Sequence, residues 1–325
     1  MTAKRPVAST GAGLALALAL LALAPRALAQ GWAGAPAPSE ALQAALTQAD
    51  AGDAKALTAL ADGGDVNAQY YAGVLYIFGR GSIAKDAPRG CAYEQKASSA
   101  RADAMHLVGM CLQTGLGGAA DKTGAEAAYS RADEMGFPKS KCALGQMLMA
   151  DPAQVQRGLD LCKAAGTAGD ADAQSVVAGV YFSGAVVKRD PAEARKWYAM
   201  AAKQNDLDAA RRLGEMYAKG DGGKKDVKKA MELWIAAEKA GDPMAPILVA
   251  DQMFSQMTGG KTPGPGTYAF KNAVPVADIE VVEDWYKQAS ARDPRPDVKK
   301  RADYALAILA GLKTGAAQAA QAKKR

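Results

Sequence analysis

Aromatic residues, histidine and long hydrophobic runs are all scarce in this chain. Only 6% of the 325 residues are Phe, Trp or Tyr, and histidine occurs once, as His106. A Ser-His-Asp or Cys-His catalytic site would have to be built on that one residue. The sequence has no nucleophile-elbow motif and no Cys/His spacing typical of zinc. We therefore expect a protein that is not an enzyme and that uses no cofactor or metal.

The longest apolar run lies at the N-terminus, from Leu14 to Ala24, behind the basic pair Lys4 and Arg5. It is too short to span a bilayer as a helix, and the small residues of Ala27-Leu28-Ala29 follow it. These features predict a signal peptide over residues 1–29 that is cleaved after Ala29. The mature chain would have no membrane span. We expect it in the periplasm, with secretion as the second choice.

The net charge of +6 exaggerates how basic the mature chain is. Three of the positive charges, Lys4, Arg5 and Arg26, belong to the predicted signal peptide, which leaves 6 − 3 = +3. The remaining basic residues are scattered, except for the tail of residues 323–325. A small and dispersed charge argues against nucleic acid as a partner. The abundance of alanine and the 49% of hydrophobic residues favour closely packed helices.

One helical pattern occurs six times along the chain, which is typical of a repeat protein. The copies start at Ala68, Ala104, Ser140, Ala173, Ala209 and Ala245, which gives steps of 36, 36, 33, 36 and 36 by subtraction. Five residues after each start comes a very small residue: Gly73, Gly109, Gly145, Ala178, Gly214 or Ala250. Glycine costs about 1 kcal/mol in a helix interior. We interpret these positions as contacts where the missing side chain admits a partner helix.

A second helix follows each of the first five copies. Its predicted N-terminal residue is Asp86, Asp121, Asp190 or Asp226, with Gln154 in the shortened third copy. Aspartate can cap the free N–H groups of a helix and favours the positive end of the helix dipole. Small residues return inside this helix, as in Gly90 and Gly158. Pairs of antiparallel helices therefore stack into a right-handed α/α solenoid.

The spacing and the residues resemble the Sel-one-like repeat family, which is related to the tetratricopeptide repeats. The fourth and fifth copies carry the resemblance best, in "DPAEARKWYAMAAKQND" and "LGEMYAKGDGGKKDVKKAMELW". The resemblance implies an all-α, right-handed superhelical solenoid of tetratricopeptide-like helix pairs, with about six repeats and capping helices. It is a strong indication of fold and a weak one of function.

The chain divides around these repeats. A linker over residues 30–38 follows the signal peptide, a capping half-repeat covers 39–65, and the six repeats cover 66–291. A Pro/Gly-rich insertion over 255–277 interrupts the sixth repeat, either as a binding loop or as a tolerated extension. Residues 292–325 are expected to form a capping helix, from Asp297 to Leu312, and a frayed tail.

Four cysteines allow three sets of disulfides. Cys91 and Cys111, and likewise Cys142 and Cys162, fall at matching levels of antiparallel neighbouring helices. A Cys111–Cys142 bridge would have to cover about 7.5 Å of axial offset as well as the separation of the helices. We predict disulfides Cys91–Cys111 and Cys142–Cys162 that act as structural cross-links. The alternative is four free buried thiols.

The resemblance also implies a concave groove lined by the first helices, which would bind a protein or peptide. The predicted groove residues lie two, six and nine positions after the repeat starts: Tyr70, Val74, Ile77, His106, Met110, Gln113, Ser175, Phe182, Arg211, Glu215, Ile247, Asp251 and Phe254. This mixture of aromatics, Met and Arg is typical of binding hot spots. An ordinary half-exposed solenoid face can have the same composition.

Three functions are consistent with these observations. The first is a non-catalytic interaction scaffold or adaptor of the cell envelope, acting as a monomer, and family members in signalling and envelope assembly point to it. The second is a β-lactamase-like or penicillin-binding hydrolase, as described for some secreted, cysteine-rich relatives. Those relatives carry a regular cysteine pair in each repeat, whereas here the cysteines are confined to the first three repeats. The third is a purely structural spacer.

Overall fold

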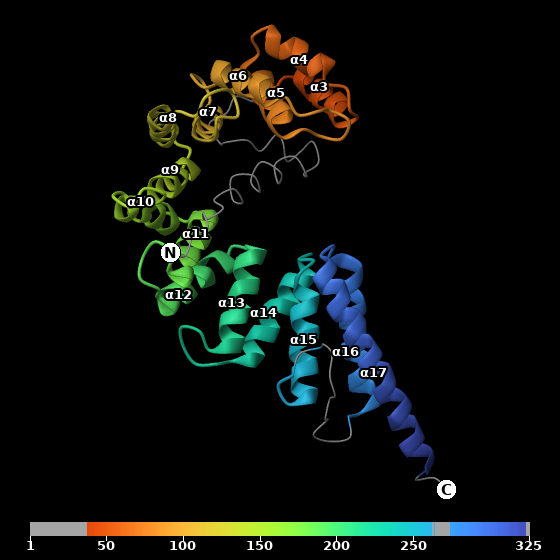
Figure 1. The fold of residues 1–325 in the computed structure, drawn as a ribbon. Helices are drawn as coiled ribbons and strands as arrows, with labels where there is room; N and C mark the ends of the chain where they lie inside the picture. Colours follow the sequence, from red (N-terminus) through yellow and green to blue (C-terminus); the bar gives the residue numbers. More distant parts are fainter. Residues whose placement is uncertain (1–37, 262, 264–273, 323–325) are drawn as a thin grey trace, which may run out of the picture. The chain divides into compact units, whose positions relative to one another are not determined.

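The computed structural model describes residues 38–261, 263 and 274–322, and in these residues the regular structure is helical except for one bridge between Arg80 and Ile83. The predicted signal peptide, most of the predicted linker and part of the predicted insertion lie outside the described residues. The helices follow one another along the chain as shown in Figure 1. They are α3 (Glu40–Asp50), α4 (Lys55–Asp62), α5 (Val66–Phe78), α6 (Ala87–Ala97), α7 (Ala102–Thr114), α8 (Lys122–Glu134), α9 (Lys139–Met149), α10 (Val155–Thr167), α11 (Ala171–Ser183), α12 (Pro191–Ala202), α13 (Leu207–Lys219), α14 (Val227–Lys239), α15 (Ala245–Thr258), α16 (Val276–Arg292) and α17 (Pro296–Ala322).

The chain forms two compact units, Met1–Val177 (unit 1) and Ala178–Arg325 (unit 2), with the boundary inside α11. In unit 1, α5 packs against α6, α7 against α8 and α9 against α10. In unit 2, α13 packs against α14 and α15 against α16. Each pair consists of a first and a second helix of one predicted repeat. The predicted all-α solenoid of helix pairs is confirmed.

The predicted aspartate caps are present at four second helices. The side chains of Asp86, Asp121, Asp190 and Asp226 accept hydrogen bonds from the backbone N–H three residues later, at 2.9–3.2 Å. Gln154 makes no such bond at the start of α10. The first helices α5 and α13 are capped in the same way, because Asp65 and Asp206 accept from the backbone N–H groups of Ala68 and Ala209. Aspartate therefore starts both helices of the first and fifth repeats.

The small residues of the first helices are contact positions, as predicted. A Cβ atom on Gly109 would lie 2.7 Å from the ring of Tyr129, and one on Gly214 would lie 2.3 Å from the indole nitrogen of Trp234. At Gly73 the same space holds the carboxylate of Glu94, 2.3 Å from such a Cβ. The lost helix propensity of glycine is thus offset by close packing of the second helix.

Both predicted disulfides are confirmed. Cys91–Cys111 connects α6 to α7, with 6.0 Å between the Cα atoms, and Cys142–Cys162 connects α9 to α10, with 4.1 Å. The first bridge therefore joins two successive repeats, and the second joins the two helices of one repeat. No cysteine remains free.

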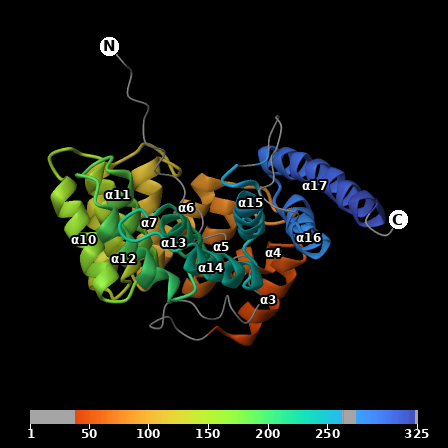
Figure 2. The same ribbon diagram turned by 90° about the horizontal axis from the view of Figure 1, so that it is seen from below.

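The two ends of the repeat array differ in detail from the prediction. Residues 39–65, predicted as a half-repeat, hold the two helices α3 and α4. At the other end, α17 continues ten residues beyond the predicted Leu312, to Ala322 (322 − 312 = 10), where a frayed tail was expected. Ala, Gln and Lys, which make up most of that segment, are strong helix formers, which accounts for the longer helix. α17 lies beside α16 in Figures 1 and 2.

The predicted insertion of residues 255–277 is helical at both ends. α15 continues to Thr258 and ends at Gly259, which has a left-handed φ of 70°, and α16 begins at Val276. Among the described residues, no helix has the length and apolar character needed to cross a membrane.

Candidate functional site

Six of the predicted groove residues lie in the hydrophobic cores of their units. Tyr70, Val74, Ile77, Met110, Ile247 and Phe254 each expose 8% of their surface or less. Tyr70 shows why: the guanidinium of Arg101, at the start of the next first helix, lies 4.2 Å from its ring centroid. This face of the first helices packs against neighbouring helices, so these six side chains are not available to a partner.

Three further predicted groove residues connect helices by hydrogen bonds. His106 Nδ1 on α7 lies 3.0 Å from Ser140 Oγ on α9, and Gln113 accepts a bond of 2.8 Å from the hydroxyl of Tyr129. Asp251 on α15 accepts a bond from Tyr286 on α16 (2.9 Å) and one from Arg301 on α17 (2.7 Å). Their polar atoms therefore hold neighbouring helices in register.

The pairing of His106 with Ser140 resembles part of a hydrolytic site, but its surroundings differ from one. Burial first, and then the charge of Lys139, lower the pKa of His106 to about 4. The imidazole is therefore neutral at physiological pH, and it packs against the rings of Tyr129 and Phe137. Ser140 has no exposed surface. Its hydroxyl cannot meet a substrate in this conformation.

Four predicted groove residues remain partly exposed without a core role: Ser175 in unit 1, and Phe182, Arg211 and Glu215 in unit 2. Phe182 on α11 lies under the guanidinium of Arg189, 5.5 Å from it. Arg211 and Glu215 lie one turn apart on α13. They belong to a polar group that we call the Arg211 cluster: Asp208, Arg211, Glu215, Asp242, Asp293 and Arg295.

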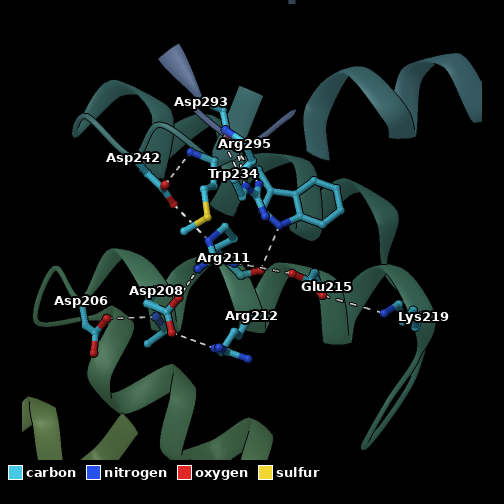
Figure 3. Close-up of polar contacts among 12 residues, drawn as sticks. Asp206, Asp208, Arg211, Arg212, Glu215, Lys219, Trp234, Asp242, Asp293 and Arg295 are labelled. Carbon is cyan, nitrogen blue, oxygen red and sulfur yellow. Dashed lines mark hydrogen bonds and ion pairs between the residues drawn. The ribbon is translucent and has the colours of Figure 1, made fainter. Parts of the chain in front are cut away.

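Carboxylates hold the Arg211 guanidinium on three sides, as Figure 3 shows. Arg211 Nη2 pairs with Asp208, Nη1 lies 3.9 Å from Glu215 Oε1, and Nε lies 3.4 Å from Asp242 Oδ2. The backbone of Arg211 is also hydrogen-bonded, because its carbonyl accepts a 3.0 Å hydrogen bond from the indole of Trp234. A residue fixed at both its backbone and its side chain presents its guanidinium in one orientation.

The Arg211 cluster runs from the surface into the protein. Side-chain exposure is 52% for Asp208, 35% for Glu215, 12% for Arg211 and 5% for Asp242. The outer members reach further charges, since Asp208 also pairs with Arg212 and Glu215 with Lys219 (Figure 3). The exposed rim thus presents both signs of charge.

The inner part of the cluster consists of groups near the ends of α14 and α16. Asp242 Oδ1 accepts a bond of 2.8 Å from the backbone of Met244 at the start of α15. Asp293 accepts hydrogen bonds from Arg295, which lower the pKa of that carboxyl, and the charge of Arg211 adds to the effect. Asp293 therefore stays ionised to a lower pH than an ordinary aspartate.

The sequence analysis identified Arg211 and Glu215 but missed Asp242, Asp293 and Arg295. Asp242 was detectable, because it follows the capping Asp206 by one repeat length (242 − 206 = 36). Asp293 and Arg295 lie beyond the insertion, where the repeat spacing no longer predicts their neighbours. The charged side chains of the Arg211 cluster can pair with charged groups of a partner.

Within the part of the chain that the structure describes, no group of three or more His, Cys, Asp and Glu residues could hold a metal ion.

Stacked helix pairs that recur in steps of 36 or 33 residues, with recurring aspartate caps and small contact residues, define an α-helical repeat protein. The Sel1 repeat matches residues 66–100, 102–129, 171–206 and 207–242. These four segments are Sel1-like repeats, and Sel1 repeat proteins are generally protein-interaction scaffolds. The third predicted repeat and the sixth lie outside the matched segments.

A solved structure agrees with this assignment of the fold. A Sel1 repeat protein from Oxalobacter formigenes is 24% identical, with a TM-score of 0.51, over 63% of this chain and 86% of that one. A protective antigen of uropathogenic Escherichia coli strains, which displays an SLR fold, is 22% identical with a TM-score of 0.49. That match covers 78% of this chain and 55% of the antigen. No curated protein sequence matches the chain.

Proposed function

We propose that this protein is a non-catalytic interaction scaffold of the cell envelope and that the exposed rim of the Arg211 cluster binds a segment of a partner protein. The observation that carries the proposal is the fixed guanidinium of Arg211, held by Asp208 on its own helix and by Asp242 beyond α14. Arginine is enriched in binding hot spots. Side chains that are already ordered lose less conformational entropy when a partner binds.

The rim suits a peptide that carries charges of both signs. A carboxylate of the partner would meet Arg212, and a basic side chain would meet Glu215 or Asp208. Paired charges of this kind set orientation and specificity more than raw affinity. Phe182 is the other predicted groove residue of unit 2 that retains partial exposure, and a partner segment would contact it in the same proposal. The protein acts as a monomer in this proposal.

The disulfides support the proposed location. Stable disulfides form in oxidising compartments such as the periplasm and the extracellular space. Two of them cross-link helices of unit 1. Together with the predicted signal peptide, they favour export to the periplasm, with secretion as the second choice.

Affinity capture from an envelope extract tests the proposed surface. The parent protein is compared with a variant that carries Arg211→Ala and Glu215→Ala. The matched control carries Arg131→Ala and Glu134→Ala, which removes an ion pair on α8 with side-chain exposures of 61% and 64%. All three proteins must give the same circular dichroism and melt cooperatively.

We expect a protein that the parent and the control recover and that the α13 variant loses. Equal recovery by all three proteins would contradict the proposed surface. Nitrocefin hydrolysis above the buffer blank by the purified parent would contradict a non-catalytic function. No observation in the structure favours the hydrolase.

A further inference from the structure

A second charged surface lies in unit 2, apart from the Arg211 cluster. An open hollow of about 630 Å³ is lined by Arg195 on α12, Tyr217 on α13, and Lys224, Lys225, Asp226 and Val227 at the start of α14. It shares no residue with the Arg211 cluster. Its lining joins three helices with the loop that connects α13 to α14.

Cations surround the aromatic ring in this hollow. The guanidinium of Arg195 stacks on Tyr217 at 3.6 Å from the ring centroid, and Lys229 Nζ lies 4.7 Å from the same centroid. A hydrogen bond from Lys229 is the main cause that lowers the pKa of Tyr217. Lys224 and Lys225 are exposed at the rim. The only carboxylate in the lining, that of Asp226, is used to cap α14.

The loop that carries the two lysines is fastened to α12. Gly222 has a φ of +74°, and a Cβ atom there would lie 2.2 Å from the carbonyl oxygen of Pro191. A Cβ on Gly223 would lie 2.5 Å from Arg195 Nη1, and Arg195 Nη2 donates a 3.2 Å hydrogen bond to the carbonyl of Lys224. The cations are therefore placed by an ordered backbone rather than by a free loop.

We propose that this hollow is a second interaction site, which binds an acidic peptide segment of a partner protein. Carboxylates of the segment pair with Arg195, Lys224 and Lys225, and a neighbouring part of the peptide packs against the ring of Tyr217. Arg and Tyr are both frequent anchors at protein interfaces, and complementary charge sets the orientation of the segment. The inference rests on the scaffold function proposed above and adds the chemistry of a partner to it.

The size of the charged area favours a peptide over a nucleic acid. Acidic residues flank the hollow, namely Asp221, which pairs with Arg189, and Glu193, which pairs with Lys196. These carboxylates limit the length of the basic surface around the hollow. A nucleic acid needs a longer basic track, because its phosphates follow one another along the whole strand.

The test is a fluorescence anisotropy titration with a fluorescein-labelled peptide of alternating Glu and Gly. The test variant carries Lys224→Gln and Lys225→Gln. The matched control carries Lys299→Gln and Lys300→Gln, which removes the same charge from an adjacent, exposed lysine pair on α17 of the same unit. We expect binding to weaken about 5-fold or more in the test variant and less than about 2-fold in the control.

Two further variants separate local geometry from charge. Gly222→Ala keeps every charge but places a Cβ against the Pro191 carbonyl, so it should weaken binding by displacing the loop. Arg131→Ala with Glu134→Ala, which removes an exposed ion pair outside both proposed surfaces, should leave peptide binding unchanged, and a loss there would overturn a local site. The peptide titration and the envelope capture are separate assays, so failure of the present proposal is distinct from failure of the proposed scaffold surface.

Three results would overturn the proposal. They are no binding of the peptide at low salt, an equal loss of binding in the two lysine variants, and tighter binding of a single-stranded oligonucleotide of the same charge. The first would exclude an acidic segment as the ligand. The second would reduce the effect to general basicity, and the third would assign the hollow to nucleic acid.

Discussion

Glu94 is a carboxylic acid enclosed in the interior of unit 1. Its side chain has no exposed surface, and neither of its oxygens has a hydrogen-bond partner within the described part of the protein. Burial raises the pKa of Glu94 well above 4.5, and the charge of Asp103 adds to the rise while Arg101 opposes it. The glycine at position 73 makes the space that this carboxyl group occupies.

Replacement of Glu94 by Gln should remove a pH dependence of stability. The folded-state pKa of Glu94 is raised, so its contribution to stability is fully present below the unfolded-state pKa and is lost as the pH rises through the folded-state value. The parent should therefore lose stability relative to Glu94→Gln as the pH rises above about 4.5. Urea unfolding at several pH values, followed by circular dichroism, measures that difference.

The exposed Glu232 on α14 supplies the control, since Glu232→Gln should leave the pH profile of the parent unchanged. The opposite result is a difference in unfolding free energy between the parent and Glu94→Gln that is the same at every pH. That result would show that Glu94 ionises in the folded protein as it does in the unfolded one.

Single residues were predictable where their role depends on the repeat itself. The caps, the small contact residues and both cysteine pairs follow from their positions along the helices. The burial of Tyr70 and Phe254 was not predictable, because it depends on how one repeat packs against the next. Arg101 illustrates the difficulty: it stands where other first helices have a capping aspartate, and its buried guanidinium pairs with Asp103 instead.

In unit 1, the backbones of α9 and α10 come close to each other at two glycines. A Cβ on Gly145 would lie 2.4 Å from the carbonyl oxygen of Gly158, and a Cβ on Gly158 would lie 2.3 Å from that of Gly145. In both cases the obstacle is backbone, which cannot rotate away as a side chain can. The pair can tolerate only glycine at these two positions without shifting a helix.

Gly145→Ala should therefore destabilise the protein by about 2 kcal/mol or more through overpacking. Gly311→Ala on α17 is the counterpart, since a Cβ there meets nothing within 4 Å. That variant should be stabilised by about 1 kcal/mol, the ordinary gain of alanine over glycine inside a helix. Thermal or urea unfolding measures both changes, and two variants that shift in the same direction would contradict this account of the helix contact.

Helices were predictable as elements because apolar and small residues recur with one spacing over six copies. Their ends were less so. α15 and α16 extend into the predicted insertion, and α17 extends past the predicted cap. Repeat spacing gives no information where the repeat stops, and there local propensity alone decides how far a helix continues.

The covalent cross-links and the fluorescent residues are divided between the two units. Both disulfides lie in unit 1, and the described tryptophans, Trp197, Trp234 and Trp285, lie in unit 2. In repeat proteins the total stability is close to a sum of terms within repeats and between neighbouring repeats. A change confined to one unit should then leave distant repeats nearly unaffected.

Reduction of the disulfides should separate the unfolding of the two units. In a Trp32→Phe background, a thiol reductant should lower the urea midpoint of part of the circular dichroism signal, because each bridge contributes about 3 kcal/mol. The tryptophan fluorescence midpoint should change little. Equal shifts of both signals would show that the chain unfolds as one cooperative molecule.

The position of the disulfides along the chain also bears on how the protein reaches its oxidised state. Each bridge joins cysteines only 20 residues apart, so the two partners meet by closing a short loop, which is fast and needs no distant contact. A chain oxidised from its N-terminus onward meets Cys91 and Cys111 before Cys142 and Cys162. The native pairs are then also the kinetically favoured ones, and correct oxidation does not depend on first making and then breaking a wrong bond.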